Sequence, residues 1–395
     1  MNQIKRKKSS VEKGKPQCSS GTRFFRGLHT GKSDGESKGE SERAEIDNSR
    51  PDNQNEKQAP CVADEPPYLI SKTNTTSGMW RIKQFMQKLG KKPNSKNMDL
   101  NNCALDATDL MELGEALETI PHLEELDLSW NNNIGGKLSL LTKRFQTGCK
   151  IKILKFTDCS LTTKDGDSLD RAFQYLPELN KLDLLCNKEI GGGFKDSATH
   201  LASFKDLEVL DLHQCCVTEE DMVVLREDSF ASLAETALHL PELEILDLSW
   251  NKCVGGNLKL LLEALKLATE IRTLRLSSCN LVAEDLTLLA LEVQGGHLAK
   301  LQKLDLSYND TVSDEGWATF FQGLTALKEL SELDVSLWPS SCPDCGMWFS
   351  KLLTDLSKLP AFTEIGMQRW ALPESQQRQM ESFNQDTKRN VHFEY

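Results

Sequence analysis

One short phrase, LxxLxL with x for any residue, recurs along this chain at a nearly constant spacing. The intervals between its aligned positions are 28, 28, 28, 28, 36, 28, 30 and 29 residues. Alternate residues of a strand point to the same side, so each phrase predicts a short strand with two inward side chains. A repeat this short must stack on its neighbours to bury an apolar core. The aligned residues are Met98, Leu126, Leu154, Leu182, Leu210, Leu246, Leu274, Leu304 and Leu333.

The repeats alternate between two kinds at the fifth residue after the aligned position. An Asn there can bond the backbone of the turn that leaves the strand. A Cys there behaves as a small apolar group with a weak donor, so these cysteines are predicted to be structural. The Asn residues are Asn131, Asn187, Asn251 and Asn309, and the Cys residues are Cys103, Cys159, Cys215 and Cys279.

This alternation of Asn-type and Cys-type units, with helical segments such as TTKDGDSLDRAFQYLPEL between the strands, resembles the ribonuclease-inhibitor-like branch of the leucine-rich-repeat family over residues 92–370. The resemblance implies an α/β solenoid of about nine repeats, a horseshoe with a parallel concave sheet and outer helices. It also implies a binding protein that holds partners on the concave face, rather than an enzyme.

Composition and repeat limits predict four segments. Residues 1–75 are rich in Ser, Lys, Glu, Asn and Gly and are expected to form a disordered tail. Residues 76–94 form a basic amphipathic helix that caps the solenoid at 95–370, with calmodulin-type or membrane-surface binding as the alternative, and 371–395 form an irregular C-terminal cap and tail. The fifth repeat carries about eight extra residues within 218–243, either as a longer helix or as a partner-contacting or silent loop.

Charge and hydropathy exclude several classes of partner. The net charge is −12, and the first 75 residues hold 14 Lys or Arg against 11 Asp or Glu, so the remainder carries −15. An acidic body is a poor ligand for phosphate backbones, so no nucleic-acid partner is expected. No apolar run reaches the roughly 18 to 20 residues of a membrane span, and the basic start lacks the apolar segment of a secretory signal.

The twelve cysteines are therefore expected to be free thiols in the cytoplasm. The basic cluster IKRKKSS near the N-terminus is read either as a nuclear-localisation or kinase-target patch or as a plain solvated tail. A monomer is expected.

A row of acidic residues is predicted to line the concave face between the inward leucines. Aligned like charges repel, so such a row favours a docking strip for a basic protein surface, or simply a device that keeps an exposed sheet soluble. Two cations, Lys155 and Arg275, interrupt it. The acids are Asp99, Asp127, Asp183, Asp211, Asp247, Asp305 and Asp334.

Three large aromatic residues are predicted on the same face, all in Asn-type repeats: Trp130, Trp250 and Tyr308. Aromatic anchors on a polar concave surface are typical of interfaces, although packing over the next repeat would explain them equally well. His213 is also predicted to face the cavity.

No catalytic or cofactor site is predicted. The lone CxxC of Cys342 and Cys345 lacks the further ligands of a zinc site, and in HQCC the side chains of His213 and Cys215 point to opposite faces. The GG pairs after each Asn turn are expected to be loop glycines rather than a phosphate cradle.

The sequence therefore favours a non-catalytic scaffold or adaptor that binds a protein partner with a basic surface on the concave face. The alternative is an activator of a small GTPase that inserts an exposed Arg, for which Arg275 is the candidate.

Overall fold

The computed structural model describes residues 96–194, 204–219, 221, 240–266, 268–388 and 390–395. The predicted tail, its basic cluster, the cap helix at 76–94 and most of the extra residues of the fifth repeat lie outside the described residues.

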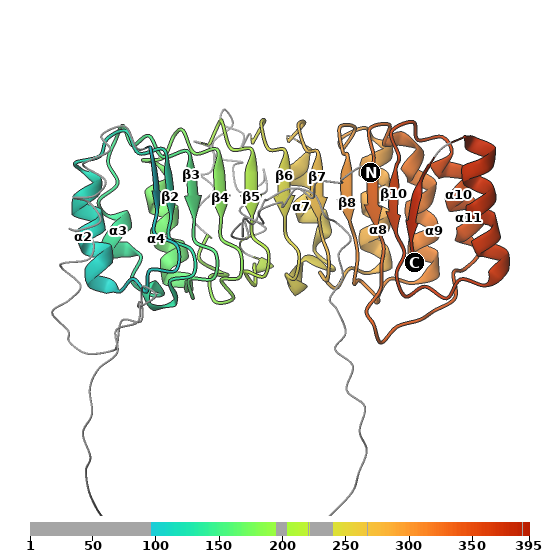
Figure 1. Cartoon of the computed structure of the whole chain (residues 1–395), viewed down its shortest axis with the longest axis horizontal. Helices are drawn as coiled ribbons and strands as arrows, with labels where there is room; N and C mark the ends of the chain where they lie inside the picture. The colour runs from blue at the N-terminus through green and yellow to red at the C-terminus, as the bar shows by residue number, and fades with distance from the viewer. Residues whose placement is uncertain (1–95, 195–203, 220, 222–239, 267, 389) are drawn as a thin grey trace, which may run out of the picture. The chain divides into compact units, whose positions relative to one another are not determined.

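Short parallel strands, each of three residues, form one sheet in strict chain order (Figure 1). Every aligned position predicted from the sequence pairs in register with the next, from Met98 opposite Leu126 to Leu304 opposite Leu333. The α/β solenoid with about nine repeats is thus confirmed, and the sheet continues through two further strands, β10 and β11. The strands are β1 Asn97–Asp99, β2 Glu125–Asp127, β3 Ile153–Lys155, β4 Lys181–Asp183, β5 Val209–Asp211, β6 Ile245–Asp247, β7 Thr273–Arg275, β8 Lys303–Asp305, β9 Glu332–Asp334, β10 Glu364–Gly366 and β11 His392–Glu394.

Helices return the chain along the outer side of the sheet, and the core lies between the two layers (Figure 1). Residues such as Leu126 and Leu128 are fully buried, as their spacing of two predicts. The described helices are α2 Ala107–Leu117, α3 Ser139–Thr142, α4 Thr163–Phe173, α7 Leu258–Leu265, α8 Ala283–Gln294, α9 Asp314–Gly323, α10 Trp348–Leu356 and α11 Glu374–Thr387. Among them none is long and apolar enough to cross a membrane.

Buried asparagines join each Asn-type repeat to the repeat before it. Asn187 donates through Nδ2 to the carbonyls of Phe156 at 2.8 Å and Leu184 at 2.7 Å. Its Oδ1 accepts from the backbone N–H groups of Cys159 at 3.1 Å and Leu161 at 3.0 Å. Asn131, Asn251 and Asn309 make the equivalent bonds, so the predicted turn role of this row is confirmed.

The cysteine row makes the complementary link. The buried thiols of Cys159, Cys215 and Cys279 each donate to a carbonyl of the preceding Asn-type repeat, at 3.1, 3.0 and 3.1 Å. Their structural role is confirmed. Cys103 differs, because its side chain is exposed in the first described repeat, where no described repeat precedes it.

The GG pairs after the Asn turns are loop glycines, as predicted, and each glycine has its own constraint. A Cβ on Gly255 would lie 1.9 Å from the carbonyl oxygen of Asn280 in the next repeat. Gly256 has φ +79°, a conformation that favours glycine. Its N–H donates at 2.8 Å to Asp285, whose carboxylate also accepts from Val282 at the start of α8.

Replacing a buried asparagine of the Asn-type repeats should lower the free energy of unfolding far more than replacing a buried cysteine of the Cys-type repeats. Asn187→Ala leaves buried backbone donors and acceptors unpaired at about 1–3 kcal/mol each, so a loss of several kcal/mol in the free energy of unfolding is expected. Cys215→Ala removes one weak thiol bond and should cost roughly 1 kcal/mol. Urea unfolding followed by circular dichroism measures both free energies of unfolding. Equal losses in the two variants would contradict a larger contribution from the asparagine.

Candidate functional site

The acidic row has a backbone role in every repeat that carries it. One carboxylate oxygen of each Asp accepts from the backbone N–H two residues further on, closing the turn after the strand. In the central repeats these bonds run from His213 to Asp211 at 3.1 Å and from Ser249 to Asp247 at 2.9 Å. The equivalent bonds involve Asp99, Asp127, Asp183, Asp305 and Asp334. The row is therefore partly a structural device, whatever else it contacts.

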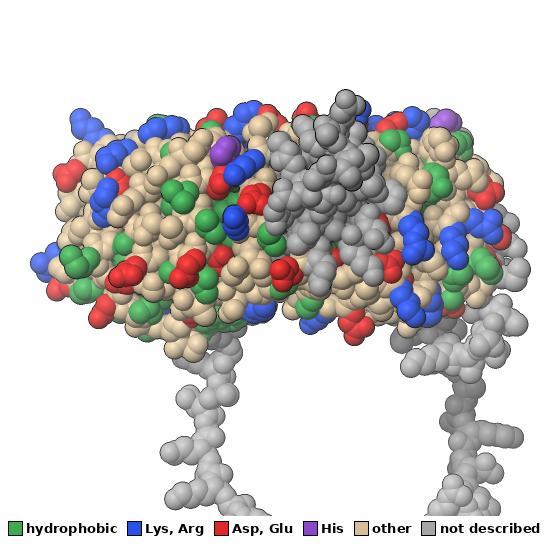
Figure 2. Space-filling view, turned by 180° about the vertical axis from the view of Figure 1, so that it is seen from behind, with side chains coloured by type: hydrophobic (Ala, Val, Ile, Leu, Met, Phe, Trp, Pro, Cys, Tyr) green, Lys and Arg blue, Asp and Glu red, His purple; other side chains and the backbone are tan. Residues whose placement is uncertain are grey.

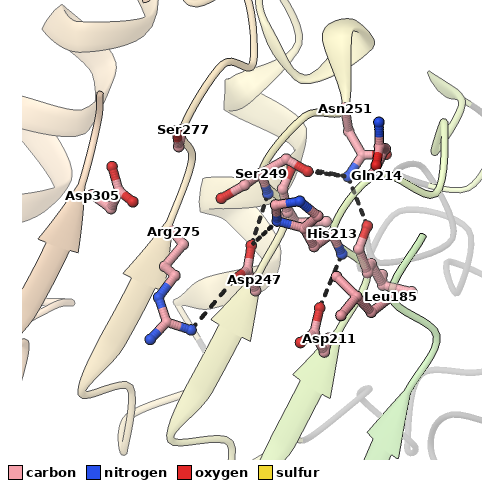
Figure 3. Close-up of polar contacts among 12 residues, drawn as sticks. Leu185, Asp211, His213, Gln214, Asp247, Ser249, Asn251, Arg275, Ser277 and Asp305 are labelled. Atoms are coloured by element: carbon pink, nitrogen blue, oxygen red, sulfur yellow. Dashed lines mark hydrogen bonds and ion pairs between the residues drawn. The ribbon is translucent and has the colours of Figure 1, made fainter. Parts of the chain in front are cut away.

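Asp247 lies at the centre of a charged cluster on the concave face (Figure 3). Its carboxylate lies 3.4 Å from a guanidinium nitrogen of Arg275 and 3.7 Å from Nδ1 of His213. Burial by itself would raise the pKa of Asp247, but His213, the Ser249 N–H and Arg275 outweigh it and lower the pKa below its ordinary value. Asp247 is thus a charged group that the fold compensates internally.

Arg275, the candidate for an inserted arginine, is engaged rather than projecting. Its guanidinium pairs with Asp247 across neighbouring strands β6 and β7. The charge that GTPase activation would use is already compensated by a carboxylate of the same sheet.

Two other members of the row titrate close to neutral pH. Burial, then the nearby carboxylates of Asp247 and Asp183, raise the pKa of Asp211 to about 7. Burial and the neighbouring Asp305 likewise raise the pKa of Asp334 to about 7, and burial raises that of Asp305. Two further predicted acids have polar side-chain neighbours: Asp127 lies 3.8 Å from Lys155, and Asp183 accepts from Thr157 at 2.9 Å.

An aromatic cluster of Trp250, Tyr308 and Trp338 forms on this face. The ring centroids of Trp250 and Trp338 lie 5.4 Å apart at 88°, and those of Tyr308 and Trp338 lie 5.0 Å apart at 39°. His213 extends the group, with its ring centroid 6.5 Å from that of Trp250. All four side chains are half-buried, so their faces and edges remain partly open to a ligand.

Trp338 is the member that the sequence reasoning missed. It stands five residues after Leu333, the position that Asn or Cys occupies in the earlier repeats. The preceding residue of each earlier repeat has a positive φ, as at Trp250 (66°), whereas Leu337 is not among the residues with positive φ. The turn therefore differs, and the indole packs on the cavity side. The sequence signal for this difference was a Trp at the position that Asn or Cys occupies in the earlier repeats.

Trp130 lies apart from the cluster. Its side chain is 53% exposed, and it has no aromatic partner within the described part of the chain. It shares the left-handed backbone of the row, with φ 63°, as do Tyr308 at 58° and Arg369 at 70° in the tenth repeat. The three predicted aromatics are thus two members of one cluster and one isolated residue.

The side chains within each of the two cysteine motifs lie in different environments. Cys215 is buried and His213 is on the cavity side, as predicted. Cys342 is exposed and Cys345 buried, with burial raising the pKa of the Cys345 thiol to about 12. No group of three or more His, Cys, Asp or Glu side chains suited to a metal ion occurs in the part of the chain that the structure describes.

Comparison with known proteins agrees with the fold. Residues 119–137 and 297–319 match the family model described as Leucine Rich repeat. The chain is 25% identical to NLR family CARD domain-containing protein 4 of Bos taurus over 72% of this chain and 24% of that protein. It is 29% identical to the ribonuclease inhibitor of Sus scrofa over 62% of this chain and 53% of that protein. The chain thus spans about a quarter to about half of the length of these relatives.

Among solved structures, an internalin from Listeria monocytogenes aligns over 79% of this chain and 86% of its own, with a TM-score of 0.44 and 14% identity.

The titration of Asp211 should appear as a pH dependence of stability. The folded chain holds this proton up to about pH 7 and the unfolded chain only to about pH 4, so stability is lost as the pH rises between the two. Asp211→Asn keeps an oxygen acceptor for the His213 N–H but removes the charge. We expect it to raise the melting temperature at about pH 8 and not at about pH 4.

Asp127→Asn is the matched control, because it removes a carboxylate that lies beside Lys155. No gain at the higher pH is expected from it. A melting temperature for Asp211→Asn that is lowered equally at both pH values would contradict the assignment.

Proposed function

We propose that this leucine-rich-repeat chain is a non-catalytic adaptor that holds a protein partner against its concave face. The aromatic cluster of Trp250, Tyr308 and Trp338 carries the proposal, because half-buried, mutually packed aromatic rings are typical anchors of interfaces. Their rings are fixed by one another, so little side-chain freedom is lost when a partner binds.

The surroundings of the cluster favour a partner with a basic surface. Asp247, Asp305 and Asp334 lie on the strands beneath the rings, and two of them have a raised pKa because of burial and like-charged neighbours. A cation brought beside them would lower that repulsion. Arg369 is exposed in the same row, which restricts where the partner's own cations can dock.

The relatives support a protein as the partner. A ribonuclease inhibitor is, by its name, a protein that acts on another protein, and 53% of the pig protein's length aligns with this chain. The thiol hydrogen bonds of Cys159, Cys215 and Cys279 require reduced cysteines, which supports an adaptor of the cytoplasm or nucleus.

The alternative, activation of a GTPase through Arg275, has less support because this guanidinium is paired with Asp247. Equal GTP hydrolysis by a panel of small GTPases with wild type, Arg275→Ala or no added protein would exclude it.

A photo-crosslinking amino acid placed at Tyr308 tests where the partner sits. On irradiation in cell lysate it should give a protein adduct, identifiable by mass spectrometry, because this ring lies in the proposed contact. The same probe at Leu291, which is 57% exposed on outer helix α8, is the matched control. The same adduct in equal yield at both positions would exclude a concave-face interface.

Variants then measure the contribution of the cluster to affinity for the identified partner. Trp250→Ala with Trp338→Ala should weaken binding by at least about 30-fold, since anchors of this kind contribute about 2 kcal/mol or more. Trp130→Ala, which removes an isolated ring on the same face, should have a smaller effect. Unfolding curves establish that the variants are folded, and unchanged affinity in the double variant would refute the anchor role.

A further inference from the structure

Among the described α-helices of the outer layer the shortest is α3 of the second repeat, and a groove opens between it and α4. Helix α3 has four residues, whereas α2 before it and α4 after it have 11 each. The groove has a volume of about 670 Å³ and is lined by residues of α3, of the turn after it and of α4. It lies on the helical side of the solenoid, away from the concave face.

The floor of this groove is fixed by buried polar and apolar side chains. The hydroxyls of Thr142 on α3 and Ser168 on α4 lie 2.6 Å apart and join the two helices. Phe145 and Ala172 are buried beside them. The floor of the groove is thus formed by packed, buried side chains.

Three exposed cations, Lys143, Lys164 and Arg171, line the groove against a single carboxylate, Asp167. None of the three makes an ion pair with another described residue. Arg144, which lies outside the groove, is by contrast 3.5 Å from Glu118 and 3.6 Å from Glu115. The groove is therefore a local positive site on a chain of net charge −12.

The surface view agrees with this distribution. Figure 2 shows Lys and Arg side chains gathered at the end of the outer face that α2 to α4 form, on the right of the view. Elsewhere on the visible surface the two signs of charge are interspersed.

The spacing of the cations indicates the form of a ligand. Lys164 and Arg171 are seven residues apart on α4, which places them on the same face and about 10 Å apart along the helix axis. A peptide in the polyproline II conformation has three residues per turn and advances about 3.1 Å per residue, so carboxylates three residues apart lie on one face and are separated by nearly the same distance.

We propose that the groove between α3 and α4 binds an acidic segment of a second protein in the polyproline II conformation, with Asp or Glu at every third position. Lys164 and Arg171 each take one carboxylate, and Lys143 on the opposite wall takes a third or the backbone of the segment. The site is independent of the concave face, so the chain can hold two partners of opposite charge at once.

A nucleic acid is the less favoured ligand for the same cations. Useful affinity for a phosphate backbone takes several neutralised phosphates, commonly about six to ten, whereas the groove offers three cations and one opposing carboxylate. Single-stranded DNA therefore serves as the competing probe in the test.

Fluorescence anisotropy with a short fluorescein-labelled peptide, carrying Glu at every third position between Gly and Ser, tests the proposal on the full chain. The wild type should bind at low ionic strength and lose affinity as salt is added, because the contacts are exposed. Reversing both charges with Lys164→Glu and Arg171→Glu should weaken binding by about tenfold or more.

Two controls isolate the groove. Lys328→Glu alters an exposed lysine outside it, and a peptide with Glu at every second position tests the spacing. Lys328→Glu should bind the original peptide with the wild-type affinity, whereas the wild type should bind the respaced peptide more weakly. The Trp250→Ala, Trp338→Ala variant should still bind the acidic peptide, so failure of the concave-face proposal would be seen separately.

Three results would overturn the proposal. These are a loss in Lys328→Glu as large as in the groove variant, binding of both peptides with equal affinity, or a single-stranded DNA oligonucleotide that binds more tightly than the peptide and with the same dependence on Lys164 and Arg171.

Discussion

Hydrogen bonds from one residue in each turn to the backbone of the repeat before it are the interaction on which the solenoid depends. An asparagine side chain has both a donor and an acceptor, so Asn251 can pair with a carbonyl and an N–H of the preceding turn at once. Cysteine supplies only a weak donor. In the alternate repeats its thiol donates to a carbonyl of the preceding repeat, as Cys279 does to Leu248. In the tenth repeat the indole of Trp370 takes this position, donating to the carbonyl of Val335 at 2.8 Å. In the described repeats that carry these bonds, the buried turns are thereby satisfied.

This inward residue also determines what the concave face displays. The residue before it adopts a left-handed backbone in the first eight repeats, at a cost of about 1–2 kcal/mol for a side chain other than glycine. Because the conformation recurs with Asn102, Asp158 and Gln214 as well as with Trp130 and Trp250, it belongs to the fold and not to the aromatic rings. The side-chain identity in this row is what varies, and two of its three aromatic members, Trp250 and Tyr308, lie in the second half of the face.

The sequence was sufficient for the fold because the Leu spacing and the Asn–Cys alternation both follow directly from stacking. The strands β10 and β11 escape that pattern, since Ile365 is followed two residues later by Met367 and Phe393 stands where an aligned Leu would be. Trp338 was missed because its prediction requires knowing that the left-handed turn is absent at Leu337. The groove between α3 and α4 could not be predicted, because it depends on the short length of α3, which the repeat spacing does not determine.

The acidic row shows why a charge pattern alone does not identify a binding surface. Each Asp caps its own turn, so the fold retains the row with or without a partner. What capping does not explain is that burial, and then repulsion by nearby carboxylates, raises the pKa of Asp211 and Asp334 to about 7. Asn would cap these turns without that repulsion. In the complex that we propose, a cation of the partner would relieve this repulsion, and the free energy released would add to the affinity.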